Sequence, residues 1–368
     1  MAPTVQETAS AALQAYTRIK PYINKTPLLP SRTTTKPATA EGTQTTLLFK
    51  TENFQRTGSF KIRGAMAKLS ATGGATSAPE TTTTTTNEND TTRSDKNDEV
   101  QSGRKERGTI TASSGNHGIG AACAASTLGK HLTVVLPENV VQAKLEKIKA
   151  YGVEVILHGS ETGLAETHAQ SLASSGEYTY ISPYNDPDVI AGQGTVGVEI
   201  LEQCRDAGGN GIVGGRVVDN VFVAMGGGGL ISGIGSVMRV LSPSTKVYGV
   251  SAVNSKALAA SMEAGGVVEV EHRKTLADAV AGGIDGDSIT VPLAREVVDV
   301  VVECEEEDIR EAIRELAFQE GMLVEGAAAL AFAGFRNVMN ETGVKGKASV
   351  VVLCGGNFDA EVIKSVLV

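Results

Sequence analysis

The sequence contains few of the residues on which several common kinds of site depend. Its 368 residues include no tryptophan, 4% aromatic residues, five histidines and four cysteines. Cys123, Cys204, Cys304 and Cys354 are widely spaced, and they form neither a CxxC pair nor a Cys/His cluster. This spacing argues against a disulfide framework and against a zinc site, and it favours a reducing compartment.

The chain also lacks an excess of positive charge and a long apolar run. Its formal net charge of −9 gives no general attraction to nucleic acid or to an anionic membrane. No stretch reaches the roughly 18 consecutive apolar residues of a transmembrane helix. Residues 1–20, which include Glu7, lack the apolar core of a signal peptide. We therefore expect a cytoplasmic protein with no nucleic-acid or membrane partner and no metal site.

What the chain does contain is an alternation of short β-branched runs and helical patterns. The length suits two domains, and 41% hydrophobic residues are enough for a sizeable core. Repeated strand–helix units predict an α/β protein with open, mainly parallel sheets flanked by helices. The runs typical of buried strands are 45–50, 108–113, 132–137, 153–157, 217–225, 246–251, 297–302 and 348–354, with helical patterns at 61–70, 117–128 and 139–152.

Residues 71–107 interrupt this alternation. The segment has almost no large apolar residue and includes six consecutive threonines. It cannot bury enough apolar surface to offset the entropy lost on ordering, so we interpret it as a disordered, low-complexity surface insertion. A tolerated loop expansion is the simpler interpretation, and a regulatory role is the alternative.

Lys61 occupies an unusual place in the sequence. It follows the turn-like residues TGS and Phe60, and it begins an apolar-periodic run. Most lysines are solvated, so a surface lysine at the start of a helix is the simpler interpretation of this residue alone. A lysine that forms a Schiff base needs a lowered pKa and a dry setting, and Phe60 could provide an apolar wall.

The stretch TASSGNHGIGAA, residues 111–122, passes from a predicted strand to a predicted helix through small polar residues. Backbone N–H groups at a helix N-terminus bind carboxylates or phosphates well, which suggests an anion site. Capping of the helix by a serine or asparagine side chain is the alternative. The residues concerned are Ser113, Ser114, Gly115, Asn116 and His117.

Four successive glycines, Gly226, Gly227, Gly228 and Gly229, follow a strand-like run and precede a helical one. Glycine lets the backbone approach an oxyanion closely and direct several N–H groups at it. A dinucleotide-binding loop is a rival interpretation, but no acidic residue ends the next predicted strand, where it would bind ribose. A compact phosphate group therefore fits better.

Together, TENFQRTGSFKIRGA, SSGNHG, GGGGL and CGGNFD, in this order, resemble the fold-type II pyridoxal-phosphate enzymes. Within them the chain is most similar to the serine/threonine dehydratase and serine racemase group. The resemblance runs from about residue 25 to the C-terminus, apart from the insertion. It implies a tryptophan synthase β-like fold, a large cofactor-binding domain at 1–70 and 186–368, and a small domain at 108–185.

The resemblance also implies a role for each motif. Lys61 would form the Schiff base with pyridoxal phosphate and transfer the Cα proton, with Phe60 packed beside the ring. Asn116 would contact the ring hydroxyl, and residues 113–117 would hold the substrate carboxylate. The cofactor phosphate would lie on Gly226, Gly227, Gly228, Gly229 and Leu230. Cys354 would face the pyridine nitrogen, although a core cysteine is the simpler interpretation of that residue alone.

The activity that the resemblance implies is α,β-elimination of a β-hydroxy-α-amino acid, such as serine, threonine or 3-hydroxyaspartate, to a 2-oxo acid and ammonia. An amino-acid racemase, with Lys61 and Ser114 on opposite faces of the substrate, is the alternative. A non-catalytic cofactor- or amino-acid-binding protein and a nicotinamide-dependent oxidoreductase are more distant alternatives. A homodimer is expected from the family.

Five positions depart from the racemase pattern or match it weakly. Ser251 and Ala257 stand where the racemases have carboxylate ligands for a divalent cation, and hard cations need such oxygens. Gly282 and Gly283 replace serines, so we expect a different pocket for the substrate side chain. Glu325 corresponds to a glutamate near the cofactor, although it could also simply complement a helix dipole.

Overall fold

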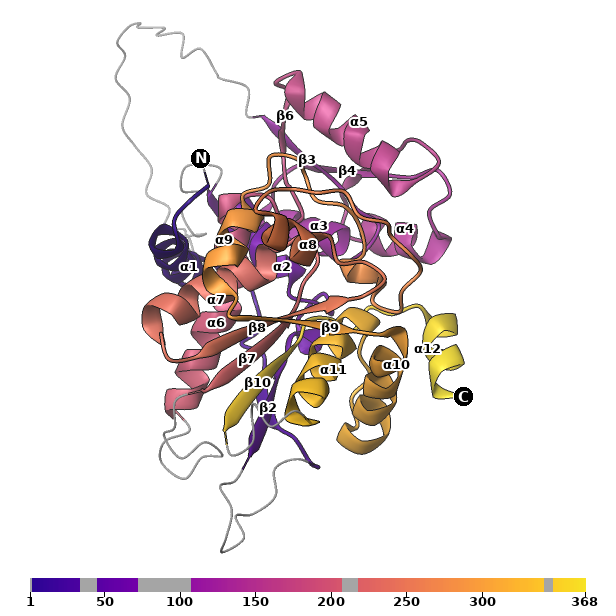
Figure 1. The fold of residues 1–368 in the computed structure, drawn as a ribbon. Helices are drawn as coiled ribbons and strands as arrows, with labels where there is room; N and C mark the ends of the chain where they lie inside the picture. Colours follow the sequence, from indigo (N-terminus) through magenta and orange to yellow (C-terminus); the bar gives the residue numbers. More distant parts are fainter. Residues whose placement is uncertain (1, 34–44, 72–106, 207–217, 341–346) are drawn as a thin grey trace, which may run out of the picture.

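The computed structural model describes residues 2–33, 45–71, 107–206, 218–340 and 347–368. The predicted insertion at 71–107 therefore lies, apart from its two end residues, outside the described part of the chain. Two open sheets with helices packed against them make up the described part, and neither closes into a barrel (Figure 1). The predicted α/β class with two mainly parallel sheets is confirmed.

The larger sheet has six strands in the order β1-β2-β10-β7-β8-β9. Only β1 is antiparallel to its neighbour, and the other pairs are parallel. Every residue of β2, β7 and β10 is buried, as expected for a parallel sheet covered on both faces. The strands are β1 (Leu28–Pro30), β2 (Thr46–Thr51), β7 (Asn220–Ala224), β8 (Lys246–Ala252), β9 (Val300–Cys304) and β10 (Ala348–Leu353).

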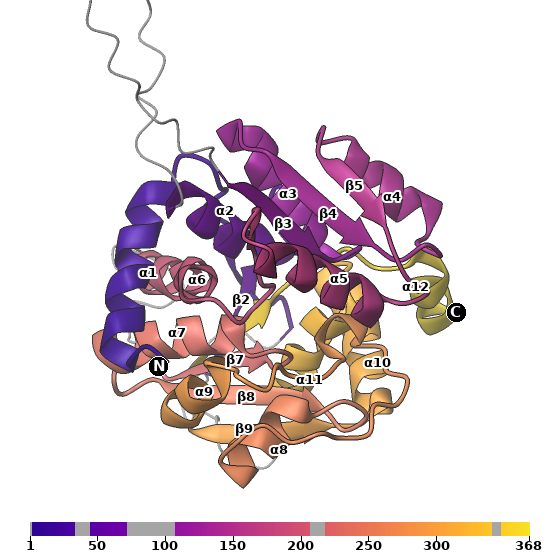
Figure 2. The same cartoon turned by 90° about the horizontal axis from the view of Figure 1, so that it is seen from above.

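Helices cover both faces of this sheet (Figures 1 and 2). The helices α10 (Glu306–Glu315) and α11 (Gly326–Asn340) lie on one face. On the other lie α1 (Val5–Ile19), α6 (Pro187–Asp206) and α7 (Gly229–Leu241). The remaining elements around the sheet are η1 (Glu52–Phe54), α8 (Ala257–Ala264), η2 (Asp278–Val280), α9 (Thr290–Val297), η3 (Leu316–Glu320) and α12 (Ala360–Leu367).

The smaller sheet has four parallel strands in the order β5-β4-β3-β6. All four strands come from residues between 108 and 180, and all strands of the larger sheet come from outside that range. The assignment of 1–70 and 186–368 to one domain and of 108–185 to another stays a prediction. The elements are β3 (Gly108–Ala112), α3 (Asn116–Leu128), β4 (Leu132–Leu136), α4 (Gln142–Lys149), β5 (Glu154–Leu157), α5 (Thr162–Ser174) and β6 (Tyr178–Tyr180).

Helix α2 (Lys61–Ala71) lies between α3 and α6, and glycines bring the three backbones into contact. A Cβ atom added at Gly120 of α3 would lie 2.9 Å from the backbone nitrogen of Ile62. A Cβ atom added at Gly192 of α6 would lie 2.4 Å from the carbonyl oxygen of Arg63. Backbone contacts on two sides therefore fix the position of the helix that begins with Lys61.

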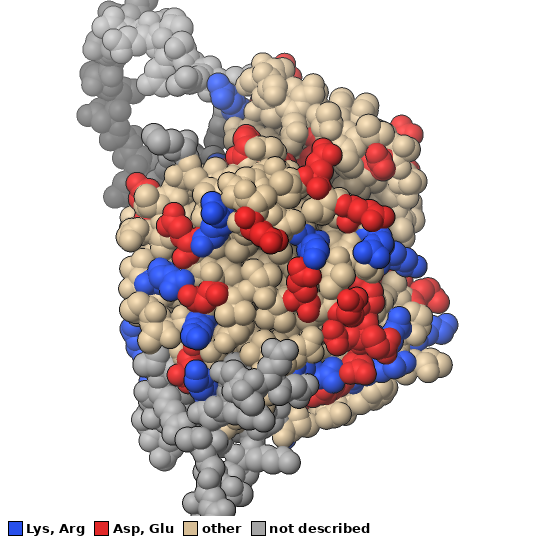
Figure 3. All heavy atoms as spheres, viewed as in Figure 1, with Lys and Arg blue, Asp and Glu red and all other residues tan. Residues whose placement is uncertain are grey.

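Charges of both signs are interspersed on the face of the molecule shown in Figure 3. Acidic side chains gather over α10, whose first turn contains Glu306, Glu307 and Asp308. None of the helices in the described ranges combines the length and apolar character needed to cross a bilayer.

Candidate active site

Three of the residues singled out by the sequence, Phe60, Lys61 and Cys354, lie at the carboxyl end of β10, next to the start of α2. Ser59 forms an isolated bridge with Gly355, and the Phe60 N–H donates to the Cys354 carbonyl at 3.1 Å. These contacts hold Lys61, the first residue of α2, beside the end of a central parallel strand. Ligands of open α/β sheets bind at this edge.

The Lys61 amine is largely removed from water. Nζ donates to the carbonyl oxygen of Pro183 at 2.8 Å and lies 5.3 Å from the centroid of the Phe60 ring. Burial lowers the pKa of Lys61 to about 8, against the opposing effect of Cys354 and Glu325. A substantial fraction of the amine is therefore neutral near physiological pH, as a nucleophile or base requires.

The turn before α3 supplies backbone N–H groups rather than a side-chain cap. The N-cap is Gly115, and no side chain bonds to the cap position. Ser113 Oγ instead accepts from the Gly115 N–H at 3.2 Å, and Ser114 lies half-exposed in the same turn. The first N–H groups of the helix are thus free of intrahelical partners and can bind an anion. Neither Ser114 nor Asn116 caps the helix with its side chain, so the capping alternative is wrong.

Asn116 and His117 begin α3, and their side chains point to different partners. Asn116 Nδ2 donates to both carboxylate oxygens of Glu325, at 2.9 and 3.0 Å. Because an amide NH2 group has two donors, one hydrogen directed at the carboxylate leaves the other for a ligand. His117 is buried, and its Nε2 lies 3.0 Å from Thr111 Oγ1 and 3.1 Å from the Ile181 carbonyl.

Burial, assisted by the charge of Lys61, lowers the pKa of His117 to about 3. Its imidazole is therefore neutral and cannot attract a carboxylate as a cation. The predicted contact of His117 with substrate would have to use its backbone N–H, which is the second of the helix.

The predicted glycine loop joins β7 to α7. Gly228 caps α7 with a φ of +88°, and no side chain bonds to this cap. A Cβ atom at Gly227 would lie 2.5 Å from the ring of Tyr184, and one at Gly228 would lie 2.8 Å from Thr290. The loop therefore admits no side chains and exposes the first N–H groups of α7, including that of Leu230. Such a site suits a phosphate group.

Cys354 is buried at the end of β10, where it also packs in the hydrophobic core. Burial raises the pKa of the thiol well above its ordinary value, and the negative charge of Glu325 acts in the same direction. The thiol therefore keeps its proton and is a neutral neighbour for a ligand.

Arg63, two residues after Lys61 in α2, belongs to a buried ion network. This network is the main feature that the sequence does not indicate. Arg63 Nε donates to Glu52 at 2.7 Å, and Arg63 Nη1 donates to Glu199 at 2.9 Å. Lys50 Nζ donates to Glu199 at 2.6 Å. All four side chains are fully buried, and their formal charges balance. Burial of a charge is tolerable only with such pairing.

The racemase pattern connects four other positions with metal binding or with the substrate side chain. These positions do not take part in the contacts of Lys61, Asn116 and Cys354 described above. Ser251 is buried on β8 with no hydrogen-bond partner for its hydroxyl, and Ala257 begins α8. Within the described residues, no three His, Cys, Asp or Glu side chains are grouped to hold a metal. Gly282 and Gly283 border open space, because a Cβ atom added there would meet nothing within 4 Å.

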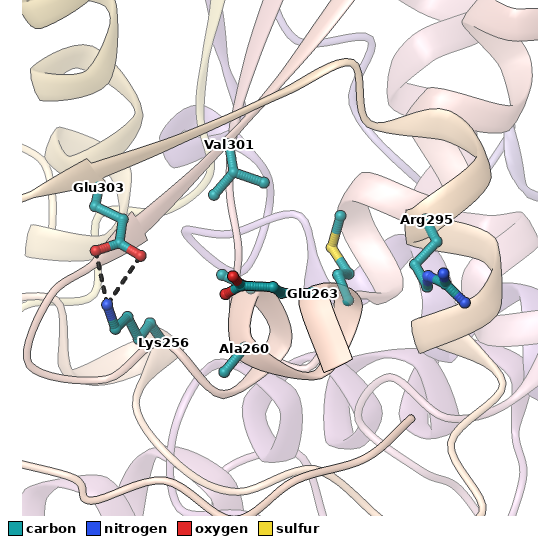
Figure 4. Close-up of a pocket in the computed structure, with 8 residues that line it drawn as sticks. Lys256, Ala260, Glu263, Arg295, Val301 and Glu303 are labelled. Carbon is teal, nitrogen blue, oxygen red and sulfur yellow. Dashed lines mark hydrogen bonds and ion pairs between the residues drawn. The ribbon is translucent and has the colours of Figure 1, made fainter. Parts of the chain in front are cut away.

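A cavity of about 530 Å³ lies on another part of the surface, between α8, α9 and β9 (Figure 4). Lys256 and Glu303 pair across it at 2.8 Å, and Arg295 and Glu263 also line it. None of the residues selected from the sequence lines this cavity, so we place the candidate active site at Lys61 instead.

Comparison with known proteins agrees with the motifs. Residues 19–356 match the family described as "Pyridoxal-phosphate dependent enzyme". An L-threonine ammonia-lyase of Thermotoga maritima is 35% identical over 321 residues, which cover 87% of this chain and 69% of that protein.

Two solved structures have similar folds. The T.th. threonine deaminase is 33% identical with a TM-score of 0.73, covering 97% of this chain and 99% of that chain. The maize serine racemase is 25% identical with a TM-score of 0.77, covering 99% and 97%. The likeness thus extends over nearly the whole of both solved chains.

Proposed function

Because the chain belongs to the family of pyridoxal-phosphate dependent enzymes, we propose that it removes water and ammonia from a β-hydroxy-α-amino acid. Threonine and serine are the favoured substrates, because relatives named as threonine ammonia-lyase and threonine deaminase are at least 33% identical to this chain. 3-Hydroxyaspartate is a further candidate. The observation that carries the proposal is the desolvated Lys61 amine at the carboxyl end of β10.

The residues present fit pyridoxal phosphate. Lys61 offers an amine for its aldehyde, and the glycine loop offers the N–H groups of α7 for its phosphate. The protonated thiol of Cys354 offers a neutral contact for its ring nitrogen. When bound, the cofactor supplies a sink for the electrons left on Cα after the proton departs.

Residues of the chain itself would bind the substrate and transfer the proton. The N–H groups at the start of α3 would bind the substrate carboxylate, which orients the Cα–H bond toward Lys61. The Lys61 amine, with a pKa of about 8, would then accept the Cα proton. Since Cys354 stays neutral, the group that would contact the ring nitrogen carries no negative charge, and we infer that prompt loss of the β-hydroxyl group is favoured.

Replacement of Lys61 by alanine tests the proposal. We expect formation of 2-oxo acid from threonine or serine to fall by about a hundredfold to ten-thousandfold, because the Cα proton loses its acceptor. A panel of β-hydroxy amino acids, with both enantiomers and both β-epimers, would identify the substrate. Full turnover by an intact Lys61→Ala protein would refute the proposed function.

A racemase is the second candidate, and the half-exposed Ser114 in the α3 turn favours it. Ser114 would supply the proton on the face opposite Lys61. Chiral analysis of the recovered amino acid separates the two activities, because Ser114→Ala would abolish inversion but spare elimination.

We also propose that the enzyme is a cytoplasmic homodimer, as the family resemblance implies. Light scattering of the purified protein would give its mass in solution, and cell fractionation its compartment.

A further inference from the structure

Glu325 precedes α11 and is almost fully buried, with 2% of its surface exposed. Both of its carboxylate oxygens accept from Asn116 Nδ2, and Oε2 also accepts from the Asn357 N–H at 3.2 Å. The carboxylate lies directly over Gly355, where an added Cβ atom would be 2.5 Å from Oε1. A buried carboxylate with three short polar contacts is a specific arrangement rather than a general complement to a helix dipole.

These contacts join segments that belong to the two sheets. Asn116 begins α3 in the part of the chain that forms the smaller sheet, and Glu325 and Asn357 belong to the part that forms the larger one. Asn116 Oδ1 accepts from Asn357 Nδ2 at 2.8 Å. Lys147 of α4 donates to Asn357 Oδ1, also at 2.8 Å. The start of α3 is thereby tied to the turn that follows β10.

We propose that Glu325 is a positioning residue whose ionised carboxylate holds Asn116, and with it the 113–116 turn, against the turn after β10. Protonation of one Glu325 oxygen leaves Asn116 Nδ2 a single, uncharged acceptor and so loosens the turn, which then keeps only the Asn116 Oδ1–Asn357 Nδ2 contact at full strength. This proposal rests on the proposed function in one respect, since the turn matters for catalysis only if it binds the substrate carboxylate.

The charged groups around Glu325 set the pH at which this change occurs. Burial, together with the charge of Asp278 of η2, raises the pKa of Glu325 to about 7 against the opposing effects of Asn116, the Asn357 N–H and Lys61. Cys354, at the end of β10, is another titratable neighbour and keeps its proton. The carboxylate therefore forms above a pH of about 7, where the contact holds, and it is lost below that pH.

Hydrogen exchange of the Ile119 amide, which donates to the Gly115 carbonyl at the start of α3, and of the Asn357 amide, which donates to Glu325, tests the proposal on the full-length holoenzyme. After correction for intrinsic chemical rates, we expect exchange in wild type to increase as the pH falls through about 7. Glu325→Gln should exchange roughly tenfold faster than wild type at high pH, because a charge-assisted contact is lost, and should show no such transition.

Two further variants sharpen the test. Asp278→Asn removes a negative charge that raises the pKa of Glu325, so the midpoint should move to lower pH. Glu166→Gln is the control, since Glu166 is a half-buried carboxyl whose pKa is also raised, but its partner is Tyr180. It should keep the wild-type profile. Asp278→Asn keeps the test decisive if Glu325→Gln does not fold.

The proposal is overturned if Glu325→Gln retains the transition, or if Asp278→Asn leaves the midpoint unchanged. Formation of 2-oxo acid is measured on the same samples. A pH-dependent α3 turn in a protein without lyase activity would refute the proposed function alone. Full lyase activity with an unresponsive turn would refute the role of Glu325 alone.

Discussion

Lys61 differs from most lysines because its side chain is half-buried, with the amine bonded to the Pro183 carbonyl and 5.3 Å from the centroid of the Phe60 ring. The direction of its pKa shift follows from that environment, since burial disfavours the charged ammonium. The amine is mostly protonated below a pH of about 8 and mostly neutral above it.

The pH dependence of kcat should reflect the protonation state of the Lys61 amine. We expect kcat to rise with pH and to level off above a pH of about 8, because only the neutral amine accepts the Cα proton. Glu325→Gln removes any change near pH 7 and should move the limb near pH 8 to lower pH, because the charge of Glu325 raises the pKa of Lys61. A flat kcat from about one pH unit below that pKa to one unit above it would contradict the assignment of Lys61 as the base.

The sequence motifs indicate that Lys61 is a reactive residue, but they do not indicate the ion pairs of Arg63, two residues away. Lys61 was identified from four motifs in a fixed order. The burial of Arg63 depends on Glu199, which lies 136 positions later in the chain. No local periodicity can reveal a pairing over that distance, and an isolated arginine in a helix is normally solvent-exposed.

At the scale of elements, the glycine loop at residues 226–229 is the clearest case in which backbone conformation determines a candidate phosphate site. Its N–H groups are available because Gly228 offers no side chain to cap α7. Tyr184 and Thr290 pack so closely on the loop that a Cβ atom would displace them.

A substitution at Gly227 should therefore weaken cofactor binding. Gly227→Ala places a Cβ atom 2.5 Å from the Tyr184 ring, and overpacking of this kind costs about 1–3 kcal/mol. Titration of pyridoxal phosphate, followed by its absorbance, should show about a tenfold to hundredfold higher Kd.

Gly163 of α5 provides the control, since a Cβ atom there meets nothing within 4 Å. Gly163→Ala should leave the Kd unchanged and slightly stabilise the helix. An equal effect of the two substitutions would argue against a phosphate site at the glycine loop.

The ends of helices and strands were predictable where a turn separates a strand-like hydrophobic pattern from a helical one. The predicted strand at 45–50 is β2, Thr46–Thr51, and the helix predicted from 61 is α2. The strand predicted at 297–302 begins only at Val300, because α9 continues to Val297. Valine residues suit a buried helix end as well as a strand, so tertiary contacts decide the boundary.

At the scale of the whole molecule, the buried ion network links β2, η1, α2 and α6. Lys50, Glu52, Arg63 and Glu199 come from these four elements and are joined by short ion pairs. The network therefore connects the larger sheet to the helix that begins with Lys61.

Removal of one carboxylate should destabilise the whole fold. Glu199→Gln leaves Arg63 and Lys50 with only Glu52 to balance them, and a broken buried pair typically costs about 3–5 kcal/mol. Chemical denaturation should show this loss in the free energy of unfolding. Glu361→Gln, which breaks only an exposed pair with Lys364, should have little effect. Equal stabilities of the two variants would contradict the proposed importance of the network.

The backbone contacts of α2 with α3 and α6 have a consequence for protein engineering. At Gly120 and Gly192 the neighbouring helices contact main-chain atoms of α2, so its position is fixed by backbone contacts as well as by the side chains of the ion network. The open surroundings of Gly283, in contrast, accept larger residues, whereas Gly282 in the same loop has a φ of +134° that disfavours any side chain. Libraries confined to that loop should change the range of accepted amino acids while the reactive amine stays in place, so chemistry and selectivity can be evolved separately.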